Sequence, residues 1–147
     1  MKGITLLMLF LSLQISSDAE ASIGLPPKLV DAIITVESSN RPHVVSRVGC
    51  RGLGQISEPT WYWITEMMGK DWHFDDAFDP EKNRMVTEYY LYWLTDYLLK
   101  KGQYSLDLLF ASYNAGPGAV RRAKWNVPNY PETKRYVEKV KLELGVA

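Results

Sequence analysis

The sequence predicts a mainly α domain with a loop-rich segment around residues 43–56. Most of the chain after residue 22 places apolar side chains at the i, i+3, i+4 spacing of amphipathic helices. Strand-like patterns are poor except within residues 44–56, where short β structure fits. The chain has 147 residues, which suits one domain on the usual scale of roughly 100–200 residues. Neither a repeat nor a linker divides it, so we expect one compact unit.

Residues 1–21 have the features of a secretory signal peptide. Lys2 precedes an apolar run over residues 4–13, and residues 19–21 (Ala-Glu-Ala) form a small-residue cleavage site. The run is shorter than the roughly 20 apolar residues that span a bilayer, although an uncleaved N-terminal anchor is the alternative. We expect export to the periplasm or cell envelope, no stable membrane insertion after cleavage, and a mature domain over residues 22–147.

The first helices have clear boundary signals. Pro26-Pro27 suits a helix start, and the segment before Pro42 ends that helix, because a residue preceding proline is disfavoured in the α region. Ser57 is the N-cap of the next helix. Asp79-Pro80 opens the longest helix, which Gly102 closes.

Three further segments complete the predicted helical set. Ser105 caps a helix that carries Leu108 and Leu109, and residues 117–124 add a turn or two. The last helix has its apolar face defined by Thr133, Tyr136, Val137, Val140 and Leu144.

Composition excludes several classes of function. Lys+Arg and Asp+Glu both total 17, so the charge excess typical of a nucleic-acid partner is missing. The lone Cys50 excludes an intrachain disulfide, and His43 and His73 are too few imidazoles for a multi-histidine centre. We therefore expect no metal and no cofactor.

Glu37 is the residue best placed for acid–base chemistry. It follows Ile33 and Ile34 on the apolar face of the first helix, close to the helix C-terminus. Desolvation and the negative end of the helix dipole both disfavour its charge, which keeps a carboxyl protonated near neutral pH. Periodicity fits equally well a boundary glutamate that turns its carboxylate to solvent.

Several motifs, taken together, resemble those of the lytic transglycosylases of the lysozyme superfamily, the SLT-type domain. They lie in the family's order along the chain, at residues 33–40, 46–56, 79–83, 111–118 and 131–137. The first resembles the motif around the family's catalytic glutamate, and the fourth the Tyr-Asn-Ala-Gly motif. Gly54 stands where the family commonly has methionine, and Cys50 where alanine is usual. The resemblance implies a lysozyme-like helical fold.

The same resemblance implies a reaction on peptidoglycan glycan strands. Glu37 would act alone as general acid and then base, cleaving the MurNAc-β-1,4-GlcNAc bond with formation of 1,6-anhydro-MurNAc ends. Ordinary glycosidases use two carboxyl groups; the substrate's own acetamido group would replace the second here. Asp31 and Glu58 are the nearest other carboxylates in sequence, and neither lies in a family motif.

Matching positions suggest roles for further residues. Ser46 and Gln55 would bind sugar or acetamido groups, and Tyr113 would orient Glu37. Asn114 and Glu132 would line the groove or hold its wall. Tyr136 is interpreted as a core residue, because it shares its helical stripe with apolar neighbours.

The sequence leaves alternatives open. A goose-type lysozyme would hydrolyse the same bond with water, and a wall-binding component of an assembly would need no turnover, although Glu37 speaks against lost activity. The partner apparatus, whether for secretion, conjugation or a phage, is not specified by the sequence. We expect a monomer that acts on the cell wall.

Overall fold

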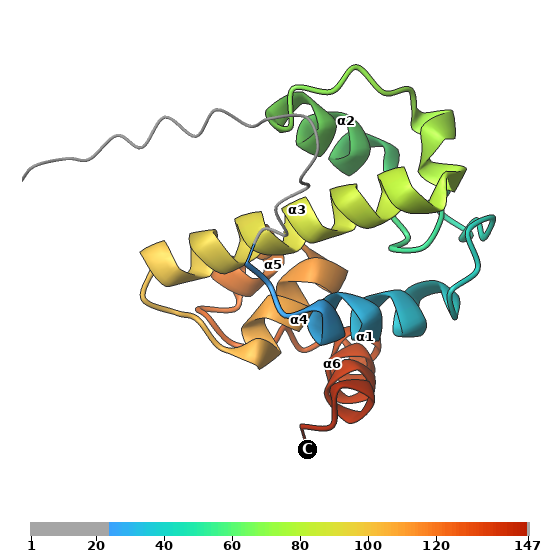
Figure 1. Cartoon of the computed structure of the whole chain (residues 1–147). Helices are drawn as coiled ribbons and strands as arrows, with labels where there is room; N and C mark the ends of the chain where they lie inside the picture. Colours follow the sequence, from blue (N-terminus) through green and yellow to red (C-terminus); the bar gives the residue numbers. More distant parts are fainter. Residues whose placement is uncertain (1–23, 147) are drawn as a thin grey trace, which may run out of the picture.

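The computed structural model describes residues 24–146, which fold as the helices shown in Figure 1. The bounds are α1 Pro27–Ser38, α2 Glu58–Met67, the 3-10 helix η1 Phe74–Phe78, α3 Pro80–Lys100, α4 Leu106–Ala115, α5 Pro117–Arg122 and α6 Pro131–Leu144. The predicted mainly α class is confirmed. Within the described residues, β structure is limited to the isolated bridges Val45–Arg51 and Arg51–Ile56. The predicted signal peptide, residues 1–21, lies outside them.

Helix α3 runs through the middle of the fold (Figure 1), and it packs against α1, α2 and α4. Its predicted cap is confirmed, because Asp79 accepts hydrogen bonds from the N–H groups of Glu81 and Lys82. The side chains of Leu91, Leu94 and Leu98 are completely buried. Each contributes about 1.5–3 kcal/mol to folding through removal of apolar surface from water.

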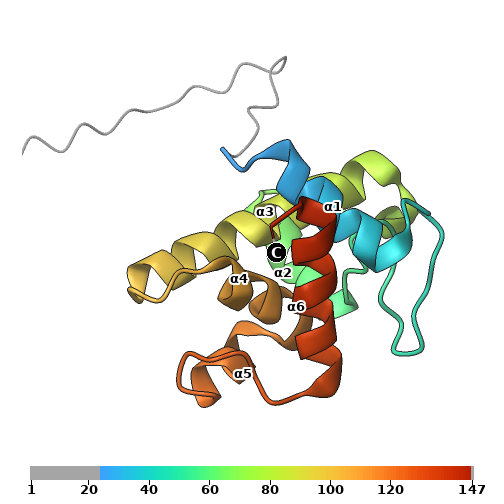
Figure 2. The same ribbon diagram turned by 90° about the horizontal axis from the view of Figure 1, so that it is seen from below.

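Helices α1, α4 and α6 carry several of the motifs identified in the sequence. Contacts join α6 to both α1 and α4, and α5 packs against α4. Seen from below in Figure 2, α6 lies beside α1 and ends near it at the chain's C-terminus. These contacts bring the end of α1 close to the beginning of α6, although the two segments are far apart in sequence.

Helix α1 ends at Ser38, although Pro42 alone would allow the helix to continue for two further residues. The last helical residue is Ser38, and Ser39 and Asn40 adopt left-handed backbone angles, with φ of 53° and 60°. The Ser39 N–H donates to Thr35 O, which satisfies one carbonyl of the last turn. The helix therefore stops immediately after Glu37 and Ser38, where the loop over residues 39–57 begins.

The segment between α2 and α3 contains η1, which the sequence pattern did not indicate. Trp61 of α2 is completely buried, and its ring packs near Trp72 and Phe74 at centroid distances of 6.2 and 6.3 Å. Its indole N–H donates to Trp72 O over 3.3 Å. Trp61 thus serves as the core of this segment, since burial of so large a ring dominates local packing.

Asn83 of α3 anchors the loop over residues 39–57. Its buried amide accepts from Gly54 N at 2.8 Å and donates to Arg51 O and Ala77 O at 3.0 and 2.8 Å. Gly52 has a φ of +75°, and a Cβ there would overlap Ala77 O and the Asn83 amide. One side chain therefore fixes the loop to both α3 and η1.

We predict that Asn83→Ala lowers the free energy of unfolding by about 2–4 kcal/mol, because the Gly54 N–H and the Ala77 carbonyl lose their buried side-chain partner. Urea denaturation followed by circular dichroism measures the change. The matched control is Asn129→Ala, since Asn129 is exposed and bonds only the flexible Lys134 amine. Equal losses in the two variants would contradict the anchoring role.

Candidate active site

Glu37 lies in the last turn of α1, on the side of the helix that carries the completely buried Ile33 and Ile34. Its side chain is half-buried. Burial raises the pKa of the Glu37 carboxyl from 4.5 to about 7, and the negative charge of Glu132 adds to the increase. Glu37 therefore holds a proton at near-neutral pH, where an ordinary glutamate would be ionised.

Tyr136 of α6 faces the Glu37 carboxyl. Its hydroxyl lies close enough to act as a hydrogen-bonding partner that lowers the pKa of Glu37, against the larger effect of burial. The same hydroxyl is buried and makes no hydrogen bond of ordinary geometry within the described chain. The contact between the Tyr136 hydroxyl and the Glu37 carboxyl is therefore longer or less well aligned than a full hydrogen bond. The hydroxyl can donate a stronger hydrogen bond once Glu37 is ionised.

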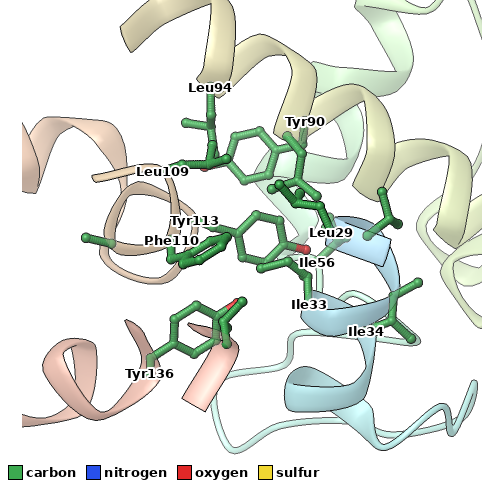
Figure 3. Packing of buried hydrophobic residues seen from close by; sticks show 14 of the residues in the cluster. Leu29, Ile33, Ile34, Ile56, Tyr90, Leu94, Leu109, Phe110, Tyr113 and Tyr136 are labelled. Atoms are coloured by element: carbon green, nitrogen blue, oxygen red, sulfur yellow. The ribbon is translucent and has the colours of Figure 1, made fainter. Parts of the chain in front are cut away.

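Tyr113 of α4 lies on another side of the same site. Figure 3 shows its ring between Tyr90 and Tyr136, with Ile33 beside it. The Tyr113 hydroxyl donates to Gly54 O over 2.6 Å. Burial, together with the charge of Glu37, raises the pKa of Tyr113 well above its usual range, and the same two causes act on Tyr136. Both phenols thus remain protonated hydrogen-bond donors at physiological pH.

Gly54 is closely enclosed by its neighbours. A Cβ at this position would overlap Thr87 Oγ1 and lie 2.9 Å from the Tyr113 hydroxyl. Thr87 is itself buried and bonds Asn83 O at 2.9 Å. Thr87 and Tyr113 therefore fill the space that a side chain at position 54 would need.

Ser46 and Gln55 form hydrogen bonds within their own loop. Ser46 Oγ accepts from Cys50 N at 3.0 Å, and Gln55 Nε2 donates to Val44 O and Gly52 O, both at 3.0 Å. These bonds leave the Ser46 hydroxyl proton and the Gln55 carbonyl oxygen uninvolved. Both residues hold the shape of the loop, and their binding of sugar groups stays a prediction.

Asn114 links α4 to α6 beside Glu132. Thr133 Oγ1 donates to Asn114 Oδ1 over 2.8 Å, which ties the last turn of α4 to the first turn of α6. Glu132 is exposed, and its negative charge raises the pKa of Glu37. Neither Asp31 nor Glu58, the nearest carboxylates in sequence, has this effect; Asp31 is exposed and pairs with Arg84 at 2.8 Å.

Of the predicted site residues, the structure brings Glu37, Tyr113 and Glu132 together, and it adds Tyr136. The helical spacing of Tyr136 with Val137 and Val140 predicts a core residue. Tyr136 is buried as predicted. A phenol oxygen in an apolar core needs a hydrogen-bond partner, and this requirement was the signal in the sequence that could have pointed to a polar group beside Tyr136. Buried hydroxyls normally find one.

The Glu37 carboxyl is suited to proton transfer. Residues 24–146 contain no group of three or more His, Cys, Asp or Glu side chains placed to hold a metal ion. A single carboxyl with a pKa of about 7 can both donate a proton and take one back near neutral pH, which is the property required of a general acid–base residue.

Comparisons with known proteins agree with this geometry. The family model described as "Transglycosylase SLT domain" matches residues 14–136. A curated relative, the endo-type membrane-bound lytic murein transglycosylase A of Klebsiella pneumoniae, is 34% identical over 116 residues, which cover 74% of this chain. The match spans 56% of that relative's own length.

Two solved structures share the fold. The 70 kDa soluble lytic transglycosylase SLT70 from Escherichia coli superposes with a TM-score of 0.70 and 28% identity, covering 82% of this chain and 21% of that one. An inactive glutamate-to-glutamine mutant of the lytic transglycosylase Slt from Pseudomonas aeruginosa gives a TM-score of 0.72 and 25% identity, covering 83% and 21%. With its lysozyme-like helical fold, the chain belongs to the transglycosylase SLT domain family.

Proposed function

We propose that the chain is an exported peptidoglycan lytic transglycosylase that cleaves the MurNAc-β-1,4-GlcNAc bond. The observation that carries this proposal is a half-buried glutamate with a pKa of about 7 at the end of α1 in an SLT-family fold. The names of the related proteins support the substrate class, since they are murein or soluble lytic transglycosylases. The signal-like residues 1–21 and the envelope setting of the Klebsiella relative support export.

In the proposed reaction, protonated Glu37 first donates its proton to the glycosidic oxygen. The bond between that oxygen and C1 of the muramic acid breaks, and the GlcNAc side leaves as an alcohol. The 2-acetamido carbonyl of the muramic acid stabilises the positive charge at C1. Glu37, now a carboxylate, takes the proton of the 6-hydroxyl as O6 attacks C1. The products are a 1,6-anhydro ring and a restored acid, and no water is consumed.

The neighbouring residues have distinct roles in this proposal. Burial keeps Glu37 protonated for the first step, and the Tyr136 hydroxyl stabilises the carboxylate that exists between the two steps. Tyr113 fixes Gly54 and thereby the loop beside Glu37. The sugar is proposed to bind the hydroxyl proton of Ser46 and the side-chain carbonyl oxygen of Gln55. It would also contact the side chains of Asn114 and Glu132.

Glu132 supports hydrolysis as a second candidate function. Its charge reaches Glu37, and a second carboxylate near the acid is what an inverting glycosidase uses to activate water. In that case the products would carry reducing ends, as those of a goose-type lysozyme do, and Glu132 would act as the base.

We predict that Glu37→Gln abolishes release of muropeptides from purified peptidoglycan while the variant stays folded. Mass spectrometry of the soluble products from the wild type should show 1,6-anhydro-MurNAc ends. Glu58→Gln is the matched control, because Glu58 is an exposed glutamate in the first turn of α2. Turnover by Glu37→Gln would overturn the assignment of the acid, and reducing ends that depend on Glu132 would favour hydrolysis.

The pKa of Glu37 predicts that activity and stability both fall as the pH rises. Turnover should fall as the pH rises through about 7, because the general acid is lost. Folding raises this pKa, so the folded chain binds the proton more tightly than the unfolded chain, and ionisation costs stability progressively between pH 4.5 and about 7.

Glu37→Gln cannot ionise, so its stability relative to the wild type should increase by roughly 2 kcal/mol between about pH 4.5 and pH 8. Urea denaturation of both proteins at the two pH values measures this. A difference that does not change with pH would show that the Glu37 carboxyl is not desolvated.

Tyr136→Phe removes the hydroxyl that stabilises ionised Glu37. We predict a roughly tenfold or greater fall in kcat and a shift of the alkaline limb of the pH–rate profile to higher pH, because the pKa of Glu37 rises further. Tyr90→Phe removes the hydroxyl of another tyrosine in the core and serves as control. A lower kcat with an unmoved pH profile would indicate a purely structural role for Tyr136.

A further inference from the structure

A chain of aromatic rings leads from the candidate active site to the surface of α3. Tyr113 lies beside Glu37, and its ring centroid is 5.4 Å from that of Tyr90. Tyr90 is 6.0 Å from Trp63 of α2, and Trp63 is 4.7 Å from Trp93. Successive rings are therefore neighbours along the whole path.

The path continues along α3 and ends after α5. The rings of Trp93 and Tyr97 stack with an interplanar angle of 7° and a centroid distance of 5.2 Å. Tyr97 lies 6.2 Å from Trp125. We call Trp63, Trp93, Tyr97 and Trp125 the aromatic row; it draws its members from α2, from α3 and from the loop between α5 and α6.

The aromatic row is partly open to solvent, unlike the aromatic residues of the core. Trp63 is 37% exposed, and the other three rings are half-buried. Trp61, two residues before Trp63, is completely buried. Trp93, Tyr97 and Trp125 pack against the hydrophobic core on one side, and the row forms a continuous, partly exposed aromatic surface of the kind that can bind ligands.

The backbone at Trp125 provides a second, independent observation. Lys124 and Trp125 have φ angles of 54° and 60°, a left-handed conformation that costs energy in residues with a Cβ. Two contacts hold it: the Trp125 N–H donates to Val120 O at 3.0 Å, and Asn126 Nδ2 donates to Lys124 O at 3.1 Å. Strained backbone of this kind persists where neighbouring contacts enforce it and is concentrated at functional sites. Here it places the indole next to Tyr97.

We propose that the aromatic row binds the sugar rings of a β-1,4-linked glycan strand beyond the sugars that contact Glu37. The C–H faces of pyranose rings are apolar and pack against aromatic rings, while the indole N–H groups can reach sugar hydroxyls. The consequence is a preference for long strands over short ones. This inference rests on the proposed function.

The test uses the Glu37→Gln chain, so that bound glycan is not cleaved. Its five tryptophans give separate indole N–H signals in an NMR titration with the hexamer or the trimer of β-1,4-linked N-acetylglucosamine. We expect the hexamer to shift the signals of Trp63, Trp93 and Trp125 and to leave those of Trp61 and Trp72 unmoved. The trimer should leave Trp125 unmoved as well.

Variants in the same background add an affinity measurement. Trp125→Ala should weaken hexamer binding roughly three- to tenfold, as expected for the loss of one stacking contact, with no change for the trimer. Trp125→Phe should restore most of the loss. Tyr92→Ala is the matched control, because Tyr92 is an aromatic residue of α3 that is 44% exposed and lies outside the aromatic row.

The outcomes separate this inference from the proposed function. If the wild type releases muropeptides but the hexamer shifts no signal of the aromatic row, or Trp125→Ala binds it unchanged, the inference is wrong and the proposed function stands. If the wild type cleaves no peptidoglycan and the Glu37→Gln chain binds neither oligosaccharide, the proposed function fails, and the inference fails with it.

Discussion

Desolvation of the Glu37 carboxyl is the physical constraint on which the rest of the site depends. It opposes stability, because an ionised carboxylate loses more by burial than a neutral acid does. The fold imposes it through the packing of α1 against α6, which places the last turn of α1 next to Glu132 and Tyr136. The apolar residues Ile33 and Ile34 of the same turn region are completely buried, so the position of Glu37 is fixed by the hydrophobic core that its neighbours help to form.

The loop beside Glu37 is held by hydrogen bonds, whereas Glu37 itself is positioned by apolar packing. Asn83 bonds the loop backbone on one side, and the Tyr113 hydroxyl bonds Gly54 O on the other. Gly54 donates through its N–H to Asn83 and accepts through its carbonyl from Tyr113. A side chain at this position would overlap Thr87 and crowd the Tyr113 hydroxyl. The site thus combines a partly desolvated carboxyl with a loop whose backbone is held by side chains of α3 and α4. This combination suits a residue that must change its protonation state while its surroundings stay in place.

The helical periods and caps predicted the fold class, the order of the helices and the burial of most core residues, since those features depend on local spacing. They also placed Glu37 correctly on the apolar face of α1. They did not indicate η1, whose position depends on the burial of Trp61 against Trp72 and Phe74. Nor could they show that Glu132, and not Asp31 or Glu58, affects Glu37, because that contact depends on how α6 packs against α1. Periodicity likewise identified Tyr136 as buried without showing where its hydroxyl points.

The most direct test of this account is the pKa of Glu37 itself. Titration of the folded chain, with the side-chain carboxyl of Glu37 followed by carbon-13 NMR and assigned by comparison with Glu37→Gln, gives it without reference to any substrate. The account predicts a midpoint near pH 7. A midpoint close to the ordinary glutamate value of 4.5 would show that the carboxyl is solvated, and would contradict the claim that the fold holds this residue ready as a general acid.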